Sequence, residues 1–412
     1  MNKRPFIILS AFLLLFSLIE KGQATETYRP ETSVAGFIQL PGSGRQVYNF
    51  NPGWRFFRGD VRGAEVVNFD DRSWNVVSTP HTVELMPAEG SGCRNYQGPA
   101  WYRKHFVLPA ETKGQRVVLH FEAAMGKQIL YLNGKRIQEH LGGYLPFTLD
   151  LTANGVQAGD SCLLAVFTDN SDDKSYPPGK RQYTLDFAYH GGIYRDVWMI
   201  AKSPVAITDA IDSQTVGGGG VFIHFDKISE KSAQVYVNTE VQNDDARSES
   251  VTVETTLTDA DGKVIKRSSG KLSLKPGEKK SICQQMEVKN PTLWSPDTPY
   301  LYRVQSRIKK GNKSIDGGIT RVGIRLAEFR GKDGFWLNGK PFGQLVGANR
   351  HQDFAYVGNA LPNSQQWRDA KRLRDAGCTI IRVAHYPQDP AFMDACDELG
   401  LFVIVATPGW QY

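Results

Sequence analysis

The chain has 412 residues, more than the ~100–200 of an ordinary domain, which predicts two to four domains. Its 41% hydrophobic and 22% charged residues are typical of a globular protein with several cores, and they exclude a largely disordered chain. The net charge of +6 is a small difference between 49 basic and 43 acidic residues without long basic runs, so no nucleic-acid partner is predicted.

The first residues carry the pattern of an export signal. Lys3 and Arg4 precede an apolar run over residues 6–19, and small residues that suit a cleavage site follow. We therefore predict a signal peptide over residues 1–24 and a secreted or periplasmic protein with no stable membrane insertion after cleavage. A retained membrane anchor is the alternative, although the run is shorter than the ~20 apolar residues that span a bilayer.

Short alternating runs follow, as in Arg116–Phe121 and residues 129–132, the second directly before Asn133-Gly134. Alternation around an Asn-Gly pair is the strongest short-range signal for a β-hairpin. We predict that residues 25–203 form an all-β domain of sandwich or jelly-roll kind.

A second β region covers residues 204–327. Valine-rich runs at 235–237, 251–253 and 264–265 alternate with turn residues at sandwich spacing. An immunoglobulin-like sandwich is predicted, although its disulfide signature is missing.

The period of the pattern changes in residues 328–412. Residues 343–348 read as a buried strand, and a helix is predicted from about Ser364 to Gly377 with Trp367, Ala370 and Leu373 on its apolar stripe. Thr379–Ala384 is the next predicted strand.

Asp389-Pro390 is a helix start, Gly400 is its end, and Leu401–Val405 is a third strand. Strands that alternate with helices must pair in parallel. Because the third strand would leave an open sheet edge, we expect the chain to be cut short within this domain.

Short motifs recur in a fixed order along nearly the whole mature chain. The first region holds Phe69–Trp74, Thr79–His81, Trp101–Lys104, His120–Glu122, Tyr131–Lys135, His140–Phe147 and Gly191–Val197. The second holds Leu293–Pro296, Pro299–Tyr302 and Val322–Arg325, and the third holds Leu337–Pro341, Gly347–His351, Arg382–Pro387 and Cys396–Leu401. Each motif is weak alone, but the ordered set resembles glycoside hydrolase family 2, of the β-galactosidase/β-glucuronidase type.

The resemblance implies a jelly-roll sugar-binding domain, an immunoglobulin-like β-sandwich and the first three β-strands of a (β/α)8 TIM barrel. It also implies hydrolysis of terminal non-reducing β-glycosides with retention, which needs two carboxyl groups about 5–5.5 Å apart. The family places them after the fourth and seventh barrel strands. We therefore expect the acid/base and the nucleophile beyond Tyr412, and a 412-residue chain that is inactive by itself. A non-catalytic secreted carbohydrate-binding or adhesion protein is the alternative.

Carried over by resemblance, His351 and His385, at the ends of the first two barrel strands, would bind hydroxyl groups of the non-reducing sugar. A neutral imidazole both donates and accepts, which suits a hydroxyl. Each histidine could instead satisfy a buried backbone group. Asp186, in the first domain, would reach into the same pocket, although a turn-forming Asx bond is its alternative. Weaker candidates are Arg350, Arg382 and Asp353, which could equally form structural ion pairs.

The sequence departs from the β-galactosidase branch in two places. Ala406–Tyr412 replaces a segment that holds magnesium in that branch, and the cysteines lack metal-site spacing, so neither a metal nor another cofactor is predicted. Trp410 in this segment could stack on a sugar face or cap the barrel rim. Gln352 stands where both branches commonly have glutamate, which leaves the substrate open beyond a β-linked carbohydrate. The sequence also leaves open whether the protein forms a homo-oligomer.

Overall fold

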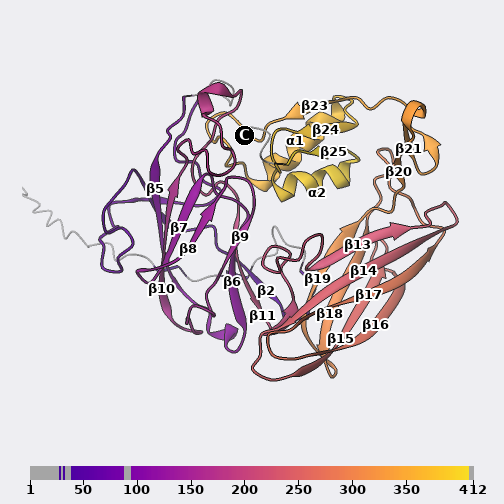
Figure 1. The fold of residues 1–412 in the computed structure, drawn as a ribbon, viewed down its shortest axis with the longest axis horizontal. Coiled ribbons are helices and arrows are strands. Elements are labelled where there is room, and N and C mark those ends of the chain that lie inside the picture. The colour runs from indigo at the N-terminus through magenta and orange to yellow at the C-terminus, as the bar shows by residue number, and fades with distance from the viewer. Residues whose placement is uncertain (1–26, 29–30, 33–38, 88–93, 408–412) are drawn as a thin grey trace, which may run out of the picture.

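The computed structural model describes residues 27–28, 31–32, 39–87 and 94–407. The predicted signal peptide at 1–24 and Trp410 lie outside these residues. In Figure 1 the short α/β segment at the end of the chain lies beside one end of the first β domain and above the second. None of the helices in the described part has the length and apolar character needed to cross a membrane.

The first domain is a jelly-roll sandwich of two antiparallel sheets, as predicted. One sheet has the order β1 (Glu31–Thr32), β2 (Gln46–Asn49), β11 (Val197–Lys202), β6 (Arg116–Phe121) and β9 (Phe147–Asp150). The other has the order β4 (Asn75–Val77), β3 (Trp54–Arg58), β5 (Pro99–Val107), β10 (Ser161–Asp169), β7 (Lys127–Leu132) and β8 (Lys135–Leu141). Short 3-10 turns lie at η1 (Ala110–Thr112) and η2 (Gln182–Thr184).

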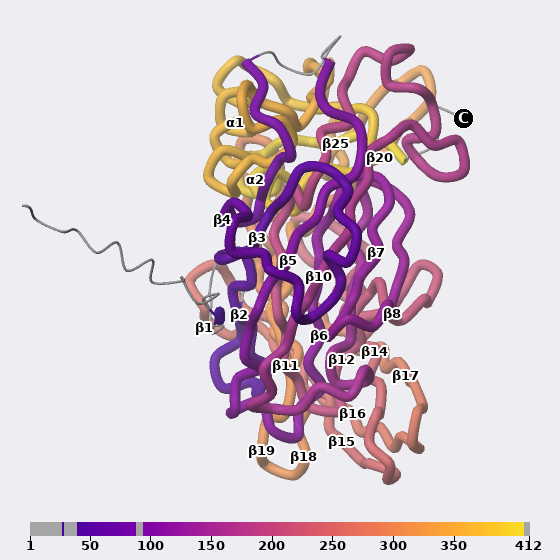
Figure 2. Tube along the Cα trace, turned by 90° about the vertical axis from the view of Figure 1, so that its left-hand side faces the viewer, coloured from indigo at the N-terminus to yellow at the C-terminus, as the bar shows by residue number. Residues whose placement is uncertain are grey.

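Aromatic side chains fill the space between these sheets, including the fully buried Phe50, Trp54 and Phe106. The predicted Asn133-Gly134 turn joins β7 to β8 with both residues at positive φ, which confirms the hairpin. Figure 2 shows the jelly roll as an elongated body with the α/β segment at its upper end.

The second domain is the predicted immunoglobulin-like sandwich. In one sheet β14 (Ser232–Asn243) pairs with β12 (Val205–Ile207), β13 (Val221–Asp226) and β17 (Lys279–Lys289). The other has the order β16 (Val264–Leu274), β15 (Glu249–Thr258), β18 (Tyr302–Lys310) and β19 (Lys313–Val322). Valines and leucines such as Val235, Leu257 and Val304 form its core.

A small antiparallel sheet leads into the α/β segment; it contains β20 (Ala327–Phe329), β21 (Phe335–Leu337) and β22 (Lys340–Pro341), with η3 (Gly331–Asp333) between the first two. The segment then runs β23 (Gly347–Arg350), α1 (Asn363–Asp375), β24 (Ile380–Val383), α2 (Pro390–Leu399) and β25 (Phe402–Val405). Both strand pairs in it are parallel, as predicted. The first strand starts later than the predicted 343–348, because its ladder begins at the pair Gly347↔Ile380.

Helix α2 has the predicted ends. The Asp389 carboxylate accepts a hydrogen bond from the Ala391 amide at 2.8 Å, and Gly400 ends the helix with φ +76°. A Cβ at Gly400 would lie 2.3 Å from the Pro296 carbonyl oxygen, so the glycine lets the helix end approach the second domain closely.

The predicted apolar stripe of α1 is wrong at Trp367. That side chain is 40% exposed and donates to Glu398 at 3.2 Å. Gln366 is buried in its place, because its amide oxygen accepts a hydrogen bond from the buried Arg350 at 2.8 Å. A polar partner behind the strand therefore rotates the helix relative to its apolar pattern.

Candidate functional site

Three predicted residues converge at the carboxyl ends of the parallel strands. His351 directly follows β23, His385 lies just after β24, and Asp186 comes from the jelly-roll loop between β10 and β11. One possible ligand atom from each of them lies within 4.8 Å of the others. We call Asp186, His351 and His385 the polar cluster. The residues lie where a barrel builds its pocket.

Buried neighbours fix the loop that carries Asp186. The Gln182 amide oxygen accepts from the Tyr189 backbone at 2.5 Å, and Asn170 donates to the Tyr189 carbonyl at 2.7 Å. Phe187 is 2% exposed, and its ring stacks on His351 with centroids 5.2 Å apart. The exposed carboxylate of Asp186 is therefore held next to the histidines by the ring that follows it in the chain.

The two imidazoles favour the neutral form. Burial lowers the pKa of His351, and burial together with the Arg382 charge lowers the pKa of His385. Asp186 opposes both shifts. A neutral histidine at each strand end can donate from one nitrogen and accept at the other.

A pair of stacked tyrosines backs the polar cluster. Tyr386, next to His385, lies face to face with Tyr144 of the jelly roll at 4.2 Å and 5° between ring planes. Its hydroxyl lies 3.3 Å from Nδ1 of His351. Sequence reasoning missed Tyr386, Tyr144 and Phe187, although Tyr386 and Phe187 each adjoin a residue that was singled out.

Arg382 and Asp353, two of the weaker predicted binding residues, have different surroundings. Arg382 lies on the face of β24 opposite Ile381 and Val383, which pack against the helices, and its charge acts on both histidines. Asp353 lies next to the jelly roll, with a carboxylate oxygen 3.8 Å from Nε2 of His190.

Arg350 is placed apart from the polar cluster. Register pairs it with Val383, so both side chains face the helix layer. There it forms an ion pair with Asp369 at 2.8 Å and lies over the Phe392 ring at 3.9 Å. This is the structural ion pair that stood as the alternative to sugar binding.

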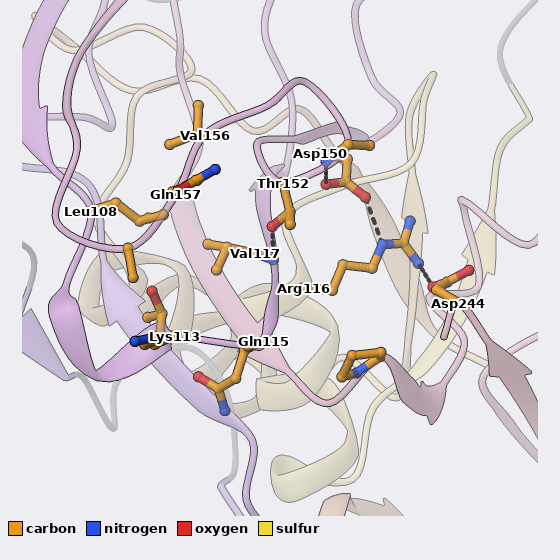
Figure 3. A pocket seen from close by; sticks show the side chains of 15 residues that line it. Leu108, Lys113, Gln115, Arg116, Val117, Asp150, Thr152, Val156, Gln157 and Asp244 are labelled. Atoms are coloured by element: carbon orange, nitrogen blue, oxygen red, sulfur yellow. Dashed lines mark hydrogen bonds and ion pairs between the residues drawn. The ribbon is translucent and has the colours of Figure 1, made fainter. Parts of the chain in front are cut away.

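A large cavity lies elsewhere in the molecule, where jelly-roll loops meet the second domain. It encloses about 780 Å³, and Arg116 in its wall bonds to Asp150 at 2.6 Å and to Asp244 at 2.8 Å (Figure 3). No residue of the polar cluster lines this cavity. The candidate site is therefore located by the convergence of complementary side chains and not by cavity size.

Known proteins share this arrangement of domains. The family model described as the sugar binding domain of glycosyl hydrolases family 2 matches residues 66–204, a second model of that family matches residues 219–325, and its TIM barrel model matches residues 329–410. The chain belongs to glycosyl hydrolase family 2. Membership in family 2 confirms the predicted order of jelly roll, immunoglobulin-like sandwich and partial TIM barrel.

Similar members of family 2 carry two kinds of name. A β-galactosidase of Thermoanaerobacter pseudethanolicus is 35% identical over 90% of this chain and 47% of its own length. A β-glucuronidase of Formosa agariphila is 32% identical over 89% of this chain and 38% of its own. The crystal structure of Bacteroides uniformis β-glucuronidase matches 88% of this chain and 42% of its own, with 32% identity and a TM-score of 0.79. The chain spans about half, or less, of the length of these relatives.

Proposed function

We propose that this chain supplies the sugar-binding wall of a β-glycosidase that releases a terminal non-reducing β-linked sugar with retention. The observation that carries the proposal is the convergence of Asp186, His351 and His385 at the strand ends. The membership in family 2, and relatives named β-galactosidase and β-glucuronidase, support the reaction class.

The polar cluster suits a sugar ring held by its hydroxyl groups. The Asp186 carboxylate accepts hydrogen bonds from adjacent hydroxyls, and the two neutral imidazoles donate to or accept from others. The Tyr386 hydroxyl, within reach of Nδ1 of His351, leaves Nε2 of that ring for the sugar. Bound in this way, the ring would present its anomeric carbon to a pair of carboxyl groups, which we place beyond Tyr412 in later barrel strands.

Export to the periplasm or the medium is part of the proposal. The basic residues and apolar run of residues 1–24 support it. Edman sequencing of the secreted mature protein is expected to start near residue 25, and a retained Met1 on membrane-bound protein would contradict it.

Hydrolysis assays on the full-length protein test the proposed function. We expect it to cleave a 4-nitrophenyl β-galactoside or β-glucuronide, and Asp186→Asn and His385→Ala each to lower kcat/KM by about 10- to 100-fold. Losing one hydrogen bond to a charged or buried group costs about 1.5–3 kcal/mol, which corresponds to such factors. The matched control is Asp173→Asn, an exposed aspartate of the same loop bonded to Ser175. Equal kcat/KM for Asp186→Asn and the control would contradict the role of Asp186.

A divalent cation is a second candidate ligand, favoured by the same geometry. Two imidazoles and one carboxylate within 4.8 Å match a common arrangement of metal ligands. Equilibrium dialysis with Zn²⁺ and Mn²⁺ separates the two ligands. If the polar cluster binds sugar, no stoichiometric metal binding should depend on Asp186. Hydrolysis should also continue in the presence of EDTA. Stoichiometric metal lost in Asp186→Asn, with hydrolysis abolished by EDTA, would favour the metal.

A further inference from the structure

We propose that Arg195 is a positioning residue: one guanidinium from the jelly roll fixes both strand-end loops that carry the histidines of the polar cluster. Arg195 lies just before β11 and is 2% exposed. The inference rests on the proposed function, because it concerns the same sugar-binding wall.

One nitrogen of Arg195 bridges the two loops. Nη2 donates to the amide oxygen of Gln352 at 3.0 Å and to the carbonyl oxygen of Pro387 at 2.8 Å. Gln352 directly follows His351, and Pro387 lies two residues after His385. The separation of the two imidazoles is therefore tied to a single buried cation that belongs to another domain.

Contacts beyond Gln352 lead to the imidazole itself. Gln352 is fully buried, and its backbone N–H lies 3.5 Å from the Tyr386 hydroxyl, at the outer limit of a hydrogen bond. That hydroxyl is the group 3.3 Å from Nδ1 of His351. On the jelly-roll side, Nη1 of Arg195 donates to the Tyr144 carbonyl at 3.4 Å, and the Tyr144 ring stacks on Tyr386. Arg195 thus contacts both the residue next to the Tyr386 hydroxyl and the residue stacked on the Tyr386 ring.

A buried carboxylate lies close to the Arg195 guanidinium. Removing the positive charge would therefore lower the stability of the fold and would not report on the positions of the two loops. Nε of Arg195 lies 3.9 Å from the Asp389 carboxylate, which also begins helix α2. A neutral replacement would leave buried acid groups without their cation, and that alone is strongly destabilising. The informative variants therefore keep the charge and change only the shape of the donor or its acceptor.

Arg195→Lys and Gln352→Met are these variants. Lysine keeps the charge but loses the planar fork, and methionine keeps the volume of Gln352 but loses the acceptor. In the full-length protein we expect each to lower kcat/KM on the 4-nitrophenyl glycoside by about 10- to 100-fold, because misplacing a substrate-positioning group by ~1 Å can cost on the order of 100-fold. Gln352→Glu retains an acceptor oxygen for Arg195 and is expected to stay within about threefold of wild type.

Arg45→Lys is the matched control. Arg45 is another jelly-roll arginine that docks a neighbouring domain, with two bonds to the buried Asp316 of the sandwich at 2.7 and 2.8 Å. We expect it to lower Tm while leaving kcat/KM unchanged. A second readout follows the imidazole NMR signals of ¹³C-labelled histidine, which should shift for both His351 and His385 in Arg195→Lys and Gln352→Met but not in Arg45→Lys.

The outcomes separate this inference from the proposed function. If Arg195→Lys and Gln352→Met lower only Tm, as Arg45→Lys does, and move neither imidazole signal, Arg195 merely docks the domains and the inference is wrong. If the wild-type protein cleaves neither glycoside, the proposed function fails, whereas the imidazole signals still decide whether Arg195 positions both loops.

Discussion

The start of the barrel is held at its two ends by different chemistry. At the amino ends of its strands it rests on the immunoglobulin-like domain through an apolar, aromatic contact. At the carboxyl ends it meets the jelly roll through stacked aromatic rings, among them Tyr144 and Tyr386, and through buried charged groups around Arg195, which form the polar end. In barrel enzymes the amino face serves stability and the carboxyl face carries the chemistry.

The apolar end centres on Trp294. It is 1% exposed and packs with Phe335, Leu337 and Phe402, the residue that begins β25. The Trp294 and Phe402 rings meet edge to face at 5.3 Å, and the indole N–H donates to the Asp397 carbonyl at 2.9 Å. Such a contact contributes mainly through the area it removes from water and tolerates small shifts.

The polar end contains three buried acids around Arg195. Glu122 accepts from the Trp198 indole at 2.9 Å, Asp196 accepts from two asparagine amides, and Asp389 begins α2. Burial raises the pKa of all three, and the charge of Asp389 adds to the increase for Glu122 and Asp196. Directional bonds of this kind tolerate little displacement, so this end costs stability and fixes geometry.

Trp294→Ala should break the apolar end and give the largest effect on stability. Deleting a buried tryptophan costs about 3–5 kcal/mol through lost burial and the cavity that remains. Guanidinium unfolding of the full-length protein measures the loss. The control is Trp367→Ala, whose half-exposed ring should cost under about 1 kcal/mol. Equal losses for the two variants would show that the Trp294 cluster does not hold the domains together.

The sequence predicted the elements of both ends better than their side-chain directions. The Asp389-Pro390 start and the Gly400 end of α2 follow from local backbone chemistry that any context preserves. The burial of Gln366 in place of Trp367 does not follow from local chemistry. It depends on Arg350, which lies on a different element.

The same limit applies to the candidate site. Asp186, His351 and His385 are expected from the family resemblance, and the structure brings them together. Arg350 lies in the same motif as His351, but parallel register with Val383 turns it to the helix layer. Arg195 lies within the motif Gly191–Val197, but nothing local distinguishes it, because its partners Gln352 and Pro387 lie more than 150 residues away in the chain. Contacts between domains leave no local pattern.

Asp196→Asn should weaken the pH dependence of the free energy of unfolding, because Asp196 is one of the buried acids of the polar end. Burial and Asp389 raise the pKa of Asp196 from 3.8 to about 6, so the folded state holds a proton that the unfolded state has released. The contribution of Asp196 to the free energy of unfolding is therefore largest below pH 3.8. It decreases between pH 3.8 and about 6, by up to ~1.4 kcal/mol per pH unit. Asparagine should flatten this slope.

Urea unfolding from pH 4 to 7 measures the slope. An asparagine can still accept from Asn51, and the Asn363 amide can rotate to accept in turn, so the variant should fold. Trp294→Ala is the control, because it lowers stability by a similar amount at every pH. A slope unchanged by Asp196→Asn would place the raised pKa on Glu122 or Asp389.

The smallest expected effect is on the histidines themselves, and it tests whether the polar cluster is one electrostatic unit. Burial lowers the pKa of His351 and His385, and Asp186 partly restores both. Asp186→Asn should therefore lower both pKa values further in an NMR titration, whereas Asp173→Asn and Trp294→Ala should move neither. Because the proposed sugar-binding role uses the neutral imidazoles, glycoside affinity should persist as pH falls through 6.5, the ordinary pKa of histidine, and disappear only below it. An unchanged pKa of either histidine in Asp186→Asn would mean that the carboxylate lies too far from that ring to act on it.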